Sequence, residues 1–137
     1  RPPRSTLSSS SAASDVYKRQ VQALAPQTVA VRCAGVRGGY ALDDAYVAGR
    51  LVDALAAAAP SAFLTDAARS ARALVRAYPD ALAALADSQS ARDLDGTGLE
   101  PDVARCARTS VLDVAPRVVE AGPGRAVVVA REVPGTF

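Results

Sequence analysis

A glycine-rich turn at residues 34–39 holds the residue types best suited to binding an anion. Its backbone N–H groups would lie at the amino end of a helix, where they and the positive end of the helix dipole attract phosphate. An arginine in the turn would add a fork of N–H donors for the same oxygens. The predicted phosphate-binding residues are Gly35, Arg37, Gly38 and Gly39.

Two neighbouring aspartates, Asp43 and Asp44, follow this turn and fall in the first turn of the same helix. Carboxylates in that position could hold a hard cation such as Mg²⁺, which would bridge to a substrate phosphate. A structural explanation accounts for the same pair, because acids at a helix start contribute about 0.3–1 kcal/mol whatever the function. Glycine clusters are likewise common in turns. Spacing alone leaves both interpretations open.

The composition excludes several other kinds of site. The chain has 137 residues and no His, so it cannot build a Ser-His-Asp triad, a Cys-His pair or a zinc site with a His ligand. Its two cysteines, Cys33 and Cys106, form no CxxC motif. We expect both to be reduced, buried packing residues rather than nucleophiles.

The charge distribution argues against a nucleic-acid partner. The formal net charge is +2, but the positive excess lies in residues 1–20 and the remainder of the chain is nearly neutral. Aromatic residues make up only 4% of the chain, so bases would find few rings on which to stack. No apolar run approaches the roughly 20 residues that span a bilayer. We therefore expect a soluble, cytoplasmic protein that binds neither nucleic acid nor membrane.

The turn and the aspartates need a strand and a helix to position them. Residues 28–33 form a β-branched run bounded by Pro26 and Gly35, which predicts a buried strand. Apolar residues then recur at the spacing of one helical face, which predicts a helix that ends at Pro60. The residues of this face are Ala41, Ala45, Ala48, Val52, Leu55 and Ala59.

The downstream sequence predicts more helices and then a hairpin. Helices are expected from residue 61 or 65 to residue 78, around residues 82–85, and over residues 101–108. Two Val-rich runs at 116–120 and 125–132 predict a β-hairpin with a loop of about four residues. The fold class is α/β, or mixed α+β, as part of a three-layer-type domain. It would have one amino-terminal buried strand, about four helices and a carboxyl-terminal β-hairpin.

The first 20 residues differ from the rest. They include a serine run and too little apolar content to offset the entropy of ordering them. Residues 14–20 look like a translated adaptor or assembly junction, so we predict that residues 1–20 are disordered and non-native. A charged targeting tail is the alternative. Residues 21–137 are the predicted folded part.

Three short motifs resemble the 2-phosphosulfolactate phosphatase family. They are Val-Arg-Cys-Ala-Gly at 31–35, Gly-Tyr-Ala-Leu-Asp-Asp-Ala at 39–45, and Ala-Gly at 48–49. Family members carry a Cys-Ala-Gly turn, an aromatic-small-Leu-acid-Asp stretch and an Ala-Gly pair at this spacing. The resemblance runs to residue 131 and implies that residues 21–137 are the carboxyl-terminal part of a phosphatase-like α/β domain. Asp43 stands where Glu is usual in the family.

The resemblance implies a Mg²⁺-dependent hydrolase of a small phosphorylated organic acid. The family's named reaction converts 2-phospho-3-sulfolactate to sulfolactate and phosphate on the route to coenzyme M. Asp44, with Asp43, would be catalytic by holding the Mg²⁺, while the glycine-rich turn steadies the phosphate oxygens. Ser88 and Asp102 are second-rank candidates, for which an N-cap and a helix-start acid are the structural explanations.

A non-catalytic helical packing or dimerisation module is the alternative function. The alanine-rich face of residues 41–59 would allow close approach of another helix, and a missing half-domain would leave apolar surface uncovered. Such a module predicts a homodimer whose formation depends on concentration.

Overall fold

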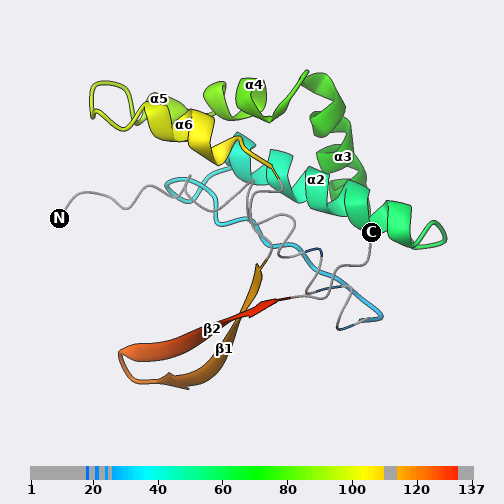
Figure 1. Ribbon diagram of the computed structural model, residues 1–137. Coiled ribbons are helices and arrows are strands. Elements are labelled where there is room, and N and C mark those ends of the chain that lie inside the picture. Colours follow the sequence, from blue (N-terminus) through cyan, green and yellow to red (C-terminus); the bar gives the residue numbers. More distant parts are fainter. Residues whose placement is uncertain (1–17, 19–20, 22–23, 25, 110–113, 133–137) are drawn as a thin grey trace.

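The computed structural model describes residues 18, 21, 24, 26–109 and 114–132 (Figure 1). The described chain forms a series of helices followed by a hairpin, which confirms the predicted mixed α/β class. Its elements are α2 (Leu42–Ala58), α3 (Asp66–Ala77), α4 (Ala81–Ala86), α5 (Gln89–Arg92), α6 (Pro101–Cys106), β1 (Val114–Gly122) and β2 (Arg125–Glu132). The prediction for residues 1–20 falls almost entirely outside the described residues.

Helix α2 begins at Leu42 without a side-chain cap, because Ala41 precedes it. Asp43 and Asp44 lie in its first turn, where their negative charge complements the positive end of the helix dipole. The helix ends at Ala58, close to the boundary that Pro60 predicts. The helix therefore starts with the two acids of the candidate site.

The next three helices begin at polar caps. In each, a side-chain oxygen accepts a hydrogen bond from the backbone N–H three residues further on, which satisfies a donor that the helix itself leaves free. These caps are Thr65, Asp80 and Ser88. Among the described residues, no helix is long and apolar enough to cross a membrane.

Helices α2 and α3 pack closely because a glycine lies between them. A Cβ added at Gly49 would lie 2.1 Å from the carbonyl oxygen of Ala71, so a larger residue would push the helices apart. On the neighbouring part of α2, Tyr46 is buried with its ring edge-on to Tyr78, at a centroid distance of 6.3 Å. The buried cluster comprises Tyr46, Ala81, Ala84, Leu85, Leu94 and Cys106.

The predicted buried strand at residues 28–33 is wrong for this structure. These residues are exposed and form no β-ladder with any described part of the chain. A strand needs a neighbour for its backbone N–H and C=O groups, and the described residues place none beside this segment. Cys33 is also exposed, against our expectation, whereas Cys106 is buried as predicted.

Strands β1 and β2 form the predicted antiparallel hairpin, which projects away from the helices in Figure 1. Val118 pairs with Val128, and the register is irregular between Val118 and Glu120. Strand β1 is longer than the sequence predicts at both ends and reaches Gly122, whereas β2 has the predicted bounds of residues 125 and 132. The connection is therefore shorter than four residues.

Candidate functional site

The glycine-rich turn is a tight reversal of the chain between Val36 and Gly39. The Gly39 N–H donates to the Val36 carbonyl at 2.8 Å, and the Val36 N–H donates back to Gly39 at 3.2 Å. Arg37 and Gly38 form the corner with φ values of 50° and 78°, a left-handed conformation that is typical of two-residue hairpin turns. The predicted turn is present, and two of its N–H groups are engaged within it.

Asp44 ties this turn to the start of α2. Its Oδ2 atom accepts a partly buried hydrogen bond of 2.7 Å from the Gly35 N–H. Gly35 itself has a φ of 74°, and a Cβ there would lie 2.4 Å from the Gly39 carbonyl oxygen. Only glycine fits at this position. In this arrangement Asp44 holds the turn in place, and the Gly35 N–H already has an acceptor.

Asp43 lies in a different environment from its neighbour. Its side chain is buried, with 3% of the residue exposed, and within the described chain its Oδ1 atom has no hydrogen-bond partner. Leaving a carboxylate oxygen buried and unpaired is costly, so native proteins usually pair such a group with a donor, a proton or a cation. Asp43 is therefore the described residue whose chemistry best fits a bound cation.

Arg37 extends from the turn to a distant part of the chain. Its guanidinium forms an ion pair with Asp93 at 3.2 Å, and the Asp93 carboxylate also accepts a hydrogen bond from Gln89 at 2.8 Å. The Arg37 side chain remains 78% exposed, so an anion can approach it. Sequence analysis missed Asp93, because no local pattern signals a contact between residues 56 positions apart.

Cys33 lies within the electrostatic field of both aspartates. Partial burial raises the pKa of its thiol, and the nearby negative charges of Asp44 and Asp43 raise it further. A raised pKa keeps the thiol protonated at neutral pH, and only the thiolate is a strong nucleophile. The electrostatics therefore favour a passive role for Cys33.

Ser88 and Asp102 take the structural roles that the sequence left open. The Ser88 hydroxyl is fully buried, donates to the Leu85 carbonyl at 2.7 Å and accepts from the Ala91 N–H at 3.1 Å. Asp102 lies in the first turn of α6 and pairs with Arg105 at 3.3 Å. The contacts of Ser88 join α4 to α5 and those of Asp102 stay within α6, so they do not connect either residue to the aspartates of α2.

The described residues offer few side chains that could bind a metal ion. In this part of the chain, no cluster of three or more His, Cys, Asp or Glu side chains is arranged to hold a metal ion. Mg²⁺ usually keeps several waters and binds through one or two carboxylates together with substrate phosphate. The buried, unpaired oxygen of Asp43 fits that pattern.

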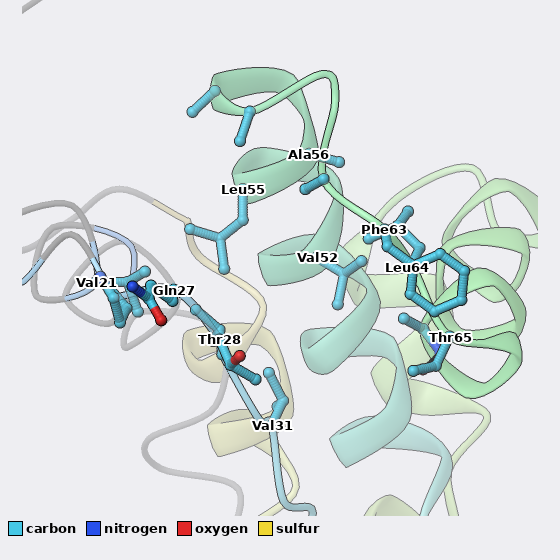
Figure 2. A pocket seen from close by; sticks show the side chains of 16 residues that line it. Val21, Gln27, Thr28, Val31, Val52, Leu55, Ala56, Phe63, Leu64 and Thr65 are labelled. Carbon is cyan, nitrogen blue, oxygen red and sulfur yellow. Dashed lines mark hydrogen bonds between the residues drawn. The ribbon is translucent and has the colours of Figure 1, made fainter.

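A separate groove of about 720 Å³ lies along the carboxyl-terminal half of α2. Figure 2 shows Val52 and Leu55 of α2 on one side and Thr28 and Val31 on the other. None of the described residues that line this groove is charged, and neither the aspartates of α2 nor the glycine-rich turn contributes to it. We call it the α2 groove.

The family model and a curated relative that match this chain both point to the same protein family. Residues 4–121 match the family model of 2-phosphosulpholactate phosphatase. A curated protein of Thermus thermophilus, described as a probable 2-phosphosulfolactate phosphatase, is 40% identical over 118 residues, which cover 82% of this chain and 47% of the relative. The chain thus spans about half the length of this relative. Because the family match begins at residue 4, it includes most of residues 1–20, whose non-native origin stays a prediction.

Proposed function

Because this chain belongs to the 2-phosphosulpholactate phosphatase family, we propose that it forms part of a phosphatase site centred on Asp43 and Asp44. The reaction is the hydrolysis of a small phosphate monoester, 2-phospho-3-sulfolactate, to sulfolactate and phosphate, a step toward coenzyme M. The observation that carries this proposal is the family match over residues 4–121. It includes the turn and both aspartates.

The buried oxygen of Asp43 supports Mg²⁺ as the cofactor. That oxygen lacks a hydrogen-bond partner among the described residues, and Asp44 presents a second carboxylate whose Oδ2 atom is already bonded to the turn. We assign Asp43 as the main protein ligand and Asp44 as the residue that couples the ligand pair to the turn. When bound, Mg²⁺ would neutralise phosphate charge and stabilise the charge that develops during hydrolysis.

Arg37 and Gly38 are the best-placed phosphate contacts in the turn. The N–H groups of Gly35 and Gly39 already donate within the protein, so these glycines shape the turn rather than contact the substrate. Nothing lies within 4 Å of a Cβ added at Gly38, and the Arg37 guanidinium is exposed. In our proposal, Arg37 exchanges its Asp93 partner for a phosphate oxygen, or contacts both, when substrate binds.

The alternative of a dimerisation module receives less support. It depends on the alanine-rich face of α2 being free for a second chain. The structure uses close approach of α2 within the chain instead, where Gly49 packs against Ala71 of α3. Ala45 and Ala48, which belong to the predicted face, are buried. We therefore place the phosphatase function first.

The test uses a hybrid protein in which this chain replaces its matched region in the Thermus relative. Phosphate release from 2-phospho-3-sulfolactate is measured with Mg²⁺, after EDTA, and after Mg²⁺ is restored. We expect release that EDTA abolishes and Mg²⁺ recovers. A hybrid with native-like circular dichroism and no release would contradict the phosphatase function, and release that is insensitive to EDTA would contradict the Mg²⁺ assignment.

A further inference from the structure

The α2 groove is an apolar surface that the described chain leaves open. Among the described residues that line it, Gln27, Thr28 and Thr65 are polar and none is charged. Phe63 lines the groove and is 85% exposed. Contiguous exposed apolar surface of this kind usually marks a place where another polypeptide or an apolar ligand binds. The chemistry of the lining therefore favours an apolar occupant.

The wall of the groove opposite α2 is the segment that resembles a strand in sequence. Val29 and Val31 both line the groove and are each 41% exposed. Two residues separated by one position share a face in a β-strand, so these valines would form one apolar face. The segment has no ladder partner among the described residues. A strand laid beside it would supply that partner.

The hairpin is a second region with exposed apolar side chains on β-strands. Its valines are exposed on β1 and β2: Val118, Val119, Val127, Val128 and Val129. An isolated two-stranded hairpin is only marginally stable in water, and three or more strands or a packed helix are normally needed. The described residues therefore present two β-type surfaces, the hairpin and the segment at 28–33, beside which further strands could pack.

The match to the longer relative suggests the source of those strands. This chain corresponds to 47% of the Thermus protein, so more than half of that relative lies outside the matched region. We propose that the α2 groove binds a β-strand from that other part of the full-length family protein. The strand pairs with residues 28–33 and places its apolar side chains between Val31 and α2.

The principal test measures association in two parts. This chain and the unmatched part of the Thermus relative are purified separately and then mixed. Sedimentation and calorimetry give the dissociation constant of their complex. We expect a one-to-one complex. Phe63→Ser should weaken it by at least about tenfold, since a large apolar side chain loses its burial. Because Phe63 is 85% exposed in the free chain, its helix content by circular dichroism should not change.

Leu82→Ser is the matched control. Leu82 is also an exposed apolar residue, at 46%, but it lies on α4 and does not line the groove. Its substitution should leave the dissociation constant unchanged. A complex that tolerates Phe63→Ser would place the contact elsewhere and overturn the proposal. A self-dimer of this chain that Phe63→Ser dissociates would assign the groove to a second copy instead.

A second measurement covers the case in which the unmatched part does not fold alone. Amide hydrogen exchange of residues 28–33 is followed in this chain and in the hybrid with the Thermus relative. Exchange should be fast in the chain and slow in the hybrid, because ladder hydrogen bonds protect the amides. Equally fast exchange in a folded hybrid would overturn the proposal. Neither experiment measures catalysis, so the result stands apart from the phosphatase function.

Discussion

Helix α2 has two halves in different surroundings. In its amino-terminal half, Ala45, Ala48 and Leu51 are buried, and the first turn is held to the glycine-rich turn by Asp44. In the carboxyl-terminal half, Val52 and Leu55 are only half-buried and face the open α2 groove. One continuous apolar stripe therefore runs from a packed region into an unpacked one.

The two halves show that the sequence pattern of a helix specifies its apolar face, whereas the neighbouring elements decide whether that face is buried. The periodic stripe is enough to predict the helix and the face that seeks burial. Whether that face is buried depends on other elements: Gly49 packs against Ala71 of α3, whereas Val52 and Leu55 line the α2 groove. The candidate site lies at the packed end of α2, and the α2 groove lies at the other.

The largest expected effect compares two leucines one turn apart on this helix. Leu51→Ala should destabilise the chain by about 2–5 kcal/mol, because it opens a cavity in packed surroundings. Leu55→Ala should cost less than about 1 kcal/mol, because Leu55 is only half-buried and much of its transfer free energy is not gained in the free chain. Urea unfolding of both variants measures the difference. Equal losses would show that the two halves are equally packed.

A glycine in the packed half gives the next largest effect. Gly49→Ala should destabilise the chain by about 3 kcal/mol, because the new methyl group would overlap the Ala71 backbone, which cannot rotate away. Gly122→Ala is the control, since nothing lies within 4 Å of a Cβ at that position. Thermal unfolding should shift for the first variant and not for the second. A neutral Gly49→Ala would mean that α2 and α3 are further apart than described.

Loss of the hydrogen bond between Asp44 and the glycine-rich turn should lower the free energy of unfolding by a smaller amount. Asp44→Ala removes the acceptor of the Gly35 N–H, and we expect a loss of about 1.5 kcal/mol, typical of a hydrogen bond to a charged group. Asp53→Asn removes a more exposed ion pair with Arg72 and should cost at most about 1 kcal/mol. Urea unfolding compares the two. If Asp53→Asn cost more, the bond to Gly35 would not be a main support of the turn.

The smallest effect is expected for Arg37. Arg37→Ala removes an exposed ion pair with Asp93, which should change the free energy of unfolding by less than about 0.5 kcal/mol. Substrate affinity of the hybrid should fall nonetheless, because the guanidinium is proposed to bind phosphate. The Michaelis constant and the unfolding midpoint measure the two effects separately. An unchanged Michaelis constant would remove Arg37 from the site.

Local signals in the sequence were sufficient for much of the fold. Proline and periodic alanines predict the limits of α2, and Ser88 is the cap that its position suggests. The hairpin follows from two valine-rich runs around a Pro-Gly turn. Each of these features depends on residues close together in the chain, so their physical causes are visible in the sequence.

Features that depend on distant partners were not predictable in the same way. Residues 28–33 have the composition of a strand but have no ladder partner among the described residues, and no local pattern reveals whether such a partner is present. The Arg37–Asp93 pair and the contact of Gly49 with Ala71 arise only once the helices pack. For the site, spacing located the two aspartates, but the burial of Asp43 and the bond from Gly35 to Asp44 required the structure.

We propose that the Oδ1 atom of Asp43, which is buried and has no hydrogen-bond partner among the described residues, serves function rather than folding. The most direct test of this claim measures phosphate release and the unfolding midpoint of the hybrid protein carrying Asp43→Asn, with Asp53→Asn on the same helix as the control. We predict that Asp43→Asn abolishes release while the midpoint stays unchanged or rises, since the Oδ1 atom of Asp43 makes no hydrogen bond among the described residues that the substitution could break, and that the control stays active. Full activity of Asp43→Asn, or its unfolding, would contradict the claim.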